Sequence, residues 1–118
     1  ESMPVKSLIT YPKSGAILNI NKPFHIRGHA WAGELEVAKM EYSIDFGCTW
    51  KSCDLEKPTN RLAWQHFSAK IDFPKKGYYE VWAKATDTKG KAQPMLLPGW
   101  NPKGYLNNAC HRIAVKIK

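Results

Sequence analysis

The sequence predicts an all-β domain built as an antiparallel β-sandwich of about seven strands. Several short segments alternate apolar and polar residues, as half-buried strands do. Turn residues separate these segments roughly every eight to twelve positions. No stretch keeps an apolar helical period, and eight scattered prolines oppose long helices. We expect residues 1–118 to form a single domain, because this length suffices for one hydrophobic core.

Two strands are predicted before the first hairpin. Residues 4–12 open the chain as a short strand that ends at Pro12, and a turn follows at 13–15. A second turn at 19–23 leads into the cleanest alternation, which runs from Phe24 to Trp31. One face of that strand carries Phe24, Ile26, Gly28 and Ala30, and the other carries His25, Arg27, His29 and Trp31.

The middle of the chain predicts a hairpin. Residues 37–45 alternate again, Phe46-Gly47 follows at once, and residues 49–55 resume as a strand. Two such runs joined by a glycine-containing loop are typical of a β-hairpin. Three later strands are expected, one within 63–73, one at 78–87 and the last at 112–118.

The segment from Thr88 to Cys110 is predicted to be a long ordered loop before the last strand. It has neither a helical nor a strand period, and it contains three prolines and three glycines. Loops of this length are usually functional or disordered. Disorder is the weaker interpretation, because five large apolar side chains are too much apolar surface to leave in water. They are Met95, Leu96, Leu97, Trp100 and Tyr105.

Basic residues outnumber acidic ones, which gives a formal net charge of +8. A field of that sign attracts anions such as nucleic acid, an acidic protein or a small oxyanion. One alternative function is therefore a free-standing binding module for a polyanion or an acidic partner, tested by the salt dependence of binding. Nucleic acid is not favoured, because lysines beside tyrosines, as in 75–79, also occur at ordinary turns. No apolar run approaches the about 20 residues that cross a bilayer.

The cysteines and histidines predict neither a metal site nor a catalytic centre. Cys48 and Cys53 would lie roughly 16 Å apart in an extended strand, whereas a disulfide needs Cα atoms within about 7 Å. His25 and His29 would lie roughly 13 Å apart on one strand face, too far to share an ion bound at about 2.1 Å. The chain has no Gly-x-Ser-x-Gly elbow and no phosphate loop. A hydrolase with an unrecognised histidine site is the weakest alternative, and an assay of the fragment alone would test it.

The residue best suited to bind a ligand is Lys103, which lies between Pro102 and Gly104. Proline constrains the backbone on one side, and glycine frees it on the other. Trp100 can anchor the loop by burying its ring. A lysine held in this way is a point positive charge with three donors, which suits an oxyanion.

Several motifs occur in order along almost the whole chain. The hairpin from Met40 to Trp50 contains the pattern Ser-x-Asp-x-Gly-x-x-Trp. The closing segment contains Trp100 to Tyr105, then Asn107-Asn108 and His111-Arg112. Further matching positions are Pro4, Val5, Ser7, Ile9, Pro12, Gly15, Ile26, Gly28, Ala30, Gly33, Lys84 to Asp87, Gly90, Gln93 and Pro94. In this order and spacing, the set resembles the C-terminal dimerisation domain of the sulfite-oxidase-type molybdenum-cofactor oxidoreductases.

The resemblance implies an immunoglobulin-like sandwich with a non-catalytic role. In that family a large catalytic domain lies N-terminal to this one and supplies both the cysteine that ligates molybdenum and most of the pterin contacts. No cofactor is therefore expected within these 118 residues. The domain joins two subunits about a two-fold axis, which implies a homodimer. Trp31 and Trp82 fall opposite the small apolar residues of their strands and are candidates for covering another surface. Bacterial members of the family are often periplasmic.

The resemblance also assigns a role to the closing loop, which in the family reaches the substrate pocket. Trp100, Asn101 and Gly104 would then anchor it. Animal and plant sulfite oxidases place an arginine, which helps bind the anion, at the position of Lys103. Lysine keeps the charge but loses the planar two-pronged fork. A small anionic substrate such as sulfite is implied, and Arg112 is expected to be structural.

Overall fold

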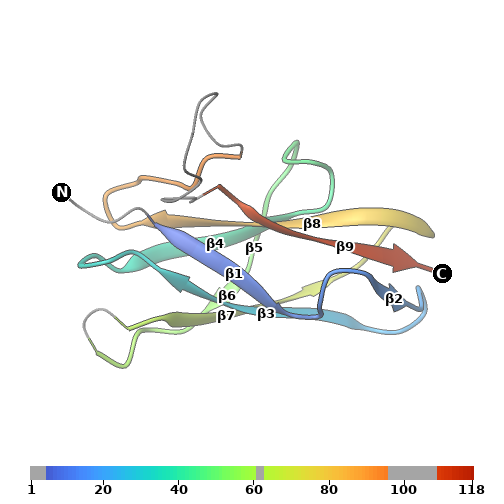
Figure 1. Ribbon diagram of the computed structural model, residues 1–118, viewed down its shortest axis with the longest axis horizontal. Coiled ribbons are helices and arrows are strands. Elements are labelled where there is room, and N and C mark those ends of the chain that lie inside the picture. The colour runs from blue at the N-terminus through green and yellow to red at the C-terminus, as the bar shows by residue number, and fades with distance from the viewer. Residues whose placement is uncertain (1–4, 61–62, 96–108) are drawn as a thin grey trace.

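The computed structural model describes residues 5–60, 63–95 and 109–118, which form a two-layer β-sandwich (Figure 1). Nine strands are present in this part of the chain. They are β1 (Lys6–Tyr11), β2 (Ala16–Leu18), β3 (Phe24–Trp31), β4 (Val37–Ser43), β5 (Lys51–Ser52), β6 (Asp54–Leu55), β7 (Gln65–Ile71), β8 (Gly77–Asp87) and β9 (His111–Ile117). The described residues contain no helix, and hence none that could cross a membrane. The predicted all-β sandwich is confirmed.

Two sheets make up the sandwich. Four strands form one sheet in the order β1-β3-β7-β6, and five form the other in the order β2-β9-β8-β4-β5. Every pair is antiparallel except β2 with β9, which is parallel. The parallel β2–β9 pair at this edge is a feature that the sequence pattern did not predict. There are two strands more than the expected seven, because the sequence pattern does not reveal β2 and because residues 49–55 divide into two strands.

The chain passes from the first sheet to the second between β1 and β2. A cis peptide bond joins Tyr11 to Pro12, and Gly15 has a φ of 95°, a left-handed conformation that glycine adopts without a steric penalty. The Gly15 N–H donates to the Ala114 carbonyl over 2.8 Å, which brings β2 beside β9. A strand of three residues is too short to show an alternating pattern, so the sequence gives no signal for it.

The strand expected over residues 49–55 is two short strands that belong to different sheets. β5 pairs with β4 in the five-stranded sheet, and β6 pairs with β7 in the four-stranded sheet. Cys53 lies between them, and its N–H donates to the Met40 carbonyl over 2.8 Å. Both residues of β5 are exposed, so no continuous apolar face holds this segment in one sheet. Cys48 and Cys53 are free thiols, as their predicted separation implied.

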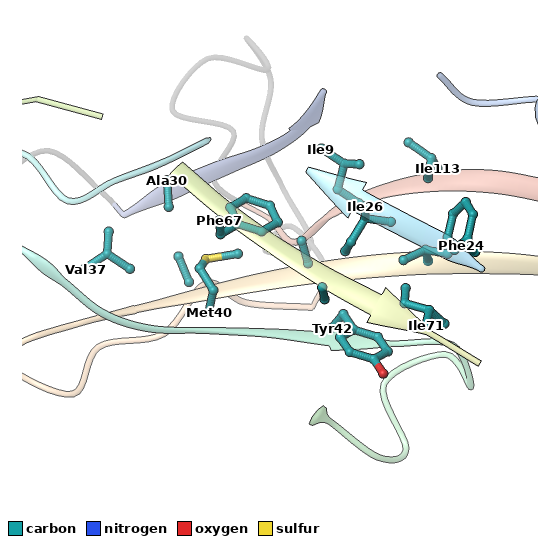
Figure 2. Close-up of a cluster of buried hydrophobic side chains, with 14 of the residues drawn as sticks. Ile9, Phe24, Ile26, Ala30, Val37, Met40, Tyr42, Phe67, Ile71 and Ile113 are labelled. Atoms are coloured by element: carbon teal, nitrogen blue, oxygen red, sulfur yellow. The ribbon is translucent and has the colours of Figure 1, made fainter. Parts of the chain in front are cut away.

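The hydrophobic core fills the space between the two sheets (Figure 2). Every second residue of β3 from Phe24 to Ala30 is buried, and Ile26 has no exposed surface, which confirms the predicted alternation. The two sheets contribute similar numbers of apolar side chains to this layer. The four-stranded sheet supplies Ile9, Phe24, Ile26, Ala30, Phe67, Ala69 and Ile71, and the five-stranded sheet supplies Val37, Met40, Tyr42, Val81, Ala83, Ala85, Ile113, Val115 and Ile117.

Gly28 occupies the centre of the four-stranded sheet for a steric reason. It pairs with Ile9 on β1 and with Phe67 on β7. A Cβ atom at this position would lie 2.1 Å from the Leu8 carbonyl oxygen and 2.4 Å from the nearest Phe67 ring carbon. Glycine is therefore the residue that lets the Phe67 ring pack over the backbone of β3.

Candidate functional site

The four residues predicted to anchor the closing loop or to bind a ligand lie outside the residues that the structure describes. They are Trp100, Asn101, Lys103 and Gly104. The structure does describe both ends of the segment that carries them, residues 93–95 and 109–112. We call these two ends the loop base. The candidate site is built from the loop base and from the strands beneath it.

A buried glutamine holds the loop base together. Gln93 is only 3% exposed. Its Oε1 accepts hydrogen bonds from the Ser7 hydroxyl (2.6 Å) and from the Ala85 N–H (2.9 Å). Its Nε2 donates to the Ala109 carbonyl over 3.2 Å. One amide side chain therefore ties β1 and β8 to the far end of the closing segment.

The two ends of the segment also bind each other directly. The Cys110 N–H donates to the Pro94 carbonyl over 2.8 Å. The Arg112 guanidinium donates to the Met95 carbonyl over 2.6 Å. Residues 94–95 and 110–112 consequently leave the sandwich side by side. The prediction that Arg112 is structural is supported by this contact.

β1 makes a second connection to the loop base through a histidine. The Ile9 N–H donates to Nδ1 of His111 over 2.8 Å, so this nitrogen is an acceptor and carries no proton. Burial lowers the pKa of His111 below its ordinary value. Both effects keep the ring neutral. Together with the Ser7–Gln93 bond, this contact fastens the edge strand of the four-stranded sheet to the start of β9 in the other sheet.

A tryptophan forms the floor of the site on the outer surface of the five-stranded sheet. Trp82 is 6% exposed, and its indole N–H donates to the Glu80 carboxylate over 2.9 Å. The Arg112 guanidinium lies 3.7 Å from the centre of the Trp82 ring, and Phe46 contacts the ring edge-on at 6.3 Å. Trp82 is thus covered by neighbours from its own chain. The prediction that Trp82 covers another surface therefore has to be set against this packing, which already buries the ring within its own chain.

The hairpin between β4 and β5 packs against the loop base through glycine. Gly47 has a φ of 84°, and a Cβ atom there would lie 2.5 Å from the Met95 sulfur. Glycine therefore meets two requirements at once, a left-handed backbone and a close contact. This explains in physical terms why the Ser-x-Asp-x-Gly-x-x-Trp pattern contains a glycine at this position.

The same hairpin is held by an aspartate that accepts several hydrogen bonds. The Ser43 hydroxyl and the N–H of Thr49 donate to one Asp45 oxygen over 2.7 Å and 2.9 Å, and the Thr49 hydroxyl donates to the other oxygen. The Ser43 oxygen in turn accepts from the Gly47 N–H over 2.9 Å. The bonds from Thr49 and Ser43 lower the pKa of Asp45 to about 2. The serine and the aspartate of the motif therefore fix the turn that contacts the loop base.

Basic side chains surround this region. Lys84 lies 4.1 Å above the Trp50 ring and 3.9 Å from the Glu41 carboxylate. Arg112 is the second cation, over Trp82. The Glu41 carboxylate also lies 3.7 Å from the Lys39 ammonium, so it forms ion pairs with two lysines. The three cations face three carboxylates in the same region, those of Glu41, Glu80 and Asp45, so the described side chains are balanced in charge.

The described residues do not form a metal or redox centre. No group of three or more His, Cys, Asp and Glu side chains among them could hold a metal ion. Burial raises the pKa of the Cys53 thiol to about 12 and also raises that of Cys110, so both side chains are protonated thiols near neutral pH.

One pair of histidines is brought together in a way that the sequence does not reveal. His29 on β3 and His66 on β7 are register partners, and their rings meet edge-on with centroids 4.6 Å apart. His25, by contrast, pairs with Lys70. Only the register between two strands, far apart in sequence, could have signalled this pair. It lies on the four-stranded sheet, whereas the loop base lies on the five-stranded sheet.

Fold and loop base together define a class of protein. It is an immunoglobulin-like β-sandwich that binds both ends of a long segment through hydrogen bonds. Its described residues contain no metal-binding cluster. Over residues 1–118 the sequence matches the family described as the Mo-co oxidoreductase dimerisation domain. The chain belongs to this family, as the ordered motifs predicted.

Relatives of this chain are much longer proteins. Mitochondrial sulfite oxidase of Mus musculus is 33% identical over 99% of this chain, which corresponds to 22% of that enzyme. The NAD(P)H nitrate reductase of Hordeum vulgare is 30% identical, and the match covers 96% of this chain and 14% of that enzyme. The chain therefore spans less than a quarter of these curated relatives.

Solved structures support the same fold. The sulfane dehydrogenase SoxCD from Paracoccus pantotrophus superposes with a TM-score of 0.74 and 26% identity, covering 97% of this chain and 30% of that one. The fibronectin(III)-like modules of CbhA from Clostridium thermocellum superpose with a TM-score of 0.59 and 21% identity, over 95% of this chain and 94% of that one. The second similarity shows only that the sandwich architecture is shared.

Proposed function

We propose that this chain is the subunit-joining domain of a sulfite-oxidase-type molybdenum oxidoreductase, and that it lends residues 100–105 to the substrate pocket of a catalytic domain. The observation that carries the proposal is the family match over residues 1–118. The similarity to mitochondrial sulfite oxidases supports a small oxyanion such as sulfite as the substrate. The molybdenum-pterin cofactor would be held by the catalytic domain, where it supplies the two-electron oxidation of the substrate.

Within this proposal, the chain's own contribution to substrate binding is the charge of Lys103. The loop base supports that role, because Gln93 and Arg112 hold both ends of the segment at fixed points on the sandwich. Fixing the two ends of the segment in advance lowers the entropic cost of placing a cation beside a ligand bound by another domain. A lysine ammonium donates to an anion as a point charge and lacks the geometric preference of arginine.

The test is Lys103→Ala in the whole enzyme. A charge-assisted hydrogen bond contributes about 1.5–3 kcal/mol, so the KM for sulfite should rise roughly 10- to 100-fold while kcat changes less. Lys103→Arg should retain most of the affinity. Lys89→Ala, at an exposed turn residue preceding the loop base, is the matched control and should leave the KM unchanged. An unchanged KM in Lys103→Ala would remove this residue from the pocket.

Subunit joining is tested separately. The whole protein should sediment as a dimer at low micromolar concentration, in line with the extensive interfaces of permanent complexes. A monomer under these conditions would contradict this half of the proposal without affecting the half that concerns Lys103.

A further inference from the structure

The outer surface of the four-stranded sheet carries a connected group of aromatic and apolar side chains. Trp31 stacks on Trp64 at 6.0 Å, Trp64 contacts His29 at 6.3 Å, and His29 contacts His66 at 4.6 Å. Leu8 pairs with His29, and Tyr11 pairs with Arg27. We call this surface the aromatic face, made of Leu8, Tyr11, His29, Trp31, Trp64 and His66.

Large parts of the aromatic face are open to solvent in the chain by itself. Leu8 is 47% exposed, Tyr11 is 49% exposed and Trp64 is 42% exposed. Scattered apolar residues on a surface are ordinary, whereas a contiguous group on one sheet face marks an interaction site. Tryptophan and tyrosine are also the residues that contribute most to protein–protein contacts.

The opposite surface of the sandwich is differently arranged. Three of the four cation–π contacts in the described part lie there, with Lys84 on Trp50, Arg112 on Trp82 and Lys116 on Tyr78. Trp50 and Trp82 on that surface therefore lie under cations of the same chain, whereas Tyr78 remains 80% exposed. The fourth contact, Arg27 over Tyr11, lies on the aromatic face. The loop base is on that surface too, so the proposed contact with the catalytic domain lies on that side. The aromatic face points the other way, so a second subunit packed on it would not displace the loop base.

We infer that the aromatic face is the surface through which two copies of this chain associate. The inference rests on the proposed subunit-joining function and names the surface that performs it. The occupant is a second copy because the family to which the chain belongs is a dimerisation domain. In a two-fold dimer the same patch serves both partners, so it must be complementary to itself.

Four charged residues around the aromatic face fit this requirement, whereas Lys70, exposed on β7, is a basic residue next to the β6 edge and does not. Lys6 and Arg27 lie on β1 and β3, toward one edge of the sheet, while Asp54 and Glu56 lie on or beside β6 at the other edge. A two-fold axis parallel to the strands places the β1 edge of one copy over the β6 edge of the other. Basic side chains of each subunit then face acidic side chains of its partner. The row that contains His29 and His66 lies near the axis and stacks on its symmetry mate.

The size of the face can be compared with that of a standard interface. An eight-residue strand is about 26 Å long, and four strands are about 19 Å wide, which gives roughly 500 Å² in projection. A standard interface buries about 800 Å² per partner. The contact would therefore have to include the turns that flank the sheet.

Dimerisation of the whole protein is the test. Leu8→Glu and Trp64→Glu each place a carboxylate within the proposed contact, and a buried unpaired charge is strongly unfavourable. Each should raise the dimer dissociation constant at least roughly 100-fold, measured by sedimentation velocity over a concentration series. The matched control is Tyr78→Glu, because Tyr78 is 80% exposed on the other sheet, and it should remain dimeric. Trp64→Ala and His66→Ala are milder substitutions that keep the test decisive where a glutamate variant fails to fold.

The possible results separate the two proposals. A monomeric wild-type protein overturns the subunit-joining function itself. A dimeric wild type whose face variants also remain dimeric overturns only the aromatic face as the interface. Face variants that stay dimeric but become sensitive to proteolysis between the domains would assign this surface to the catalytic domain and also overturn the inference.

A charge exchange tests the two-fold alignment. Arg27→Glu alone and Asp54→Arg alone should each weaken the dimer, because each places like charges opposite one another. Mixing the two variant proteins should restore association, since every cross-subunit pair is then of opposite sign. Failure of the mixture to associate better than either variant would contradict this arrangement.

Discussion

Replacing Gln93 by leucine should destabilise the loop base with little change in side-chain volume. The wild-type amide accepts two hydrogen bonds and donates one, all from a side chain that is 3% exposed. Each such bond contributes about 1 kcal/mol, and each buried partner left unsatisfied costs about 1–3 kcal/mol. Leucine leaves the Ser7 hydroxyl free to rotate toward another acceptor, but it leaves the Ala85 N–H and the Ala109 carbonyl without this partner. We expect a loss of about 3–4 kcal/mol of unfolding free energy.

Gln65 offers a matched control for this prediction. It is 4% exposed, and its amide makes three hydrogen bonds, two with the backbone of Val37 and one with that of Glu56. Gln65→Leu should therefore lose a similar free energy in urea denaturation. Its partners lie away from the loop base, so it should not alter the closing segment.

The two variants should differ in the behaviour of residues 96–108. Amide hydrogen exchange in that segment should accelerate in Gln93→Leu and not in Gln65→Leu, compared under conditions where both remain folded. In the whole enzyme, only Gln93→Leu should raise the KM for the anionic substrate. A loss below about 1 kcal/mol for Gln93→Leu, or equal acceleration in both variants, would refute the role given to this side chain.

Three further predictions concern the fold and its pH dependence. Gly28→Ala should lower the free energy of unfolding by about 3 kcal/mol or more, because the new Cβ would lie 2.1 Å from a fixed carbonyl oxygen. The control is Gly90→Ala, which has open space around it but a φ of 85° and should lose only about 1 kcal/mol. Equal unfolding midpoints for the two variants would contradict the steric explanation. Because burial lowers the pKa of His111, the unfolded state binds more protons than the folded state below about pH 6.5. The contribution of His111 to stability should therefore be fully present above that pH and should fall as the pH drops toward the folded pKa. His111→Asn should reduce this dependence of the unfolding free energy on pH, measured by denaturation curves. Because the pKa of Asp45 is lowered to about 2, its contribution to stability is present above about pH 3.8 and is lost as the pH falls through about 2. Hydrogen exchange of the Thr49 amide should accelerate at that low pH. It should accelerate already at neutral pH in Asp45→Asn, but not in the control Asp72→Asn.

The strand pattern was predictable wherever one face of a strand is buried and the other is not. The alternation of apolar and polar residues from Phe24 to Ala30 follows directly from the burial of one face of β3. β2 and β5 show no such alternation, because they have only three and two residues and lie at the two edges of their sheet. Their positions are decided by neighbouring strands, through contacts such as Gly15 with Ala114, which no local window of sequence contains.

The site was predictable only in part, for the same reason. The sequence locates the closing segment, since it lacks any period and stands between two strands. It does not reveal what holds that segment. The Ser7–Gln93 bond joins residues 86 positions apart, and the Ile9–His111 bond joins residues 102 positions apart. His29 and His66 likewise meet only through strand register.

β1 links the two surfaces assigned to this domain. Its residues alternate, so Leu8 points outward to the aromatic face while Ser7 and Ile9, on either side of it, bind Gln93 and His111 at the loop base. β1 is also an edge strand, with a hydrogen-bonded neighbour on one side only, and an edge strand is held less firmly than a central one. A second subunit packed over Leu8 would oppose fraying of β1 and so preserve both bonds. Subunit association would then stabilise the ends of the segment that contains Lys103, which would couple the two proposed tasks through one strand.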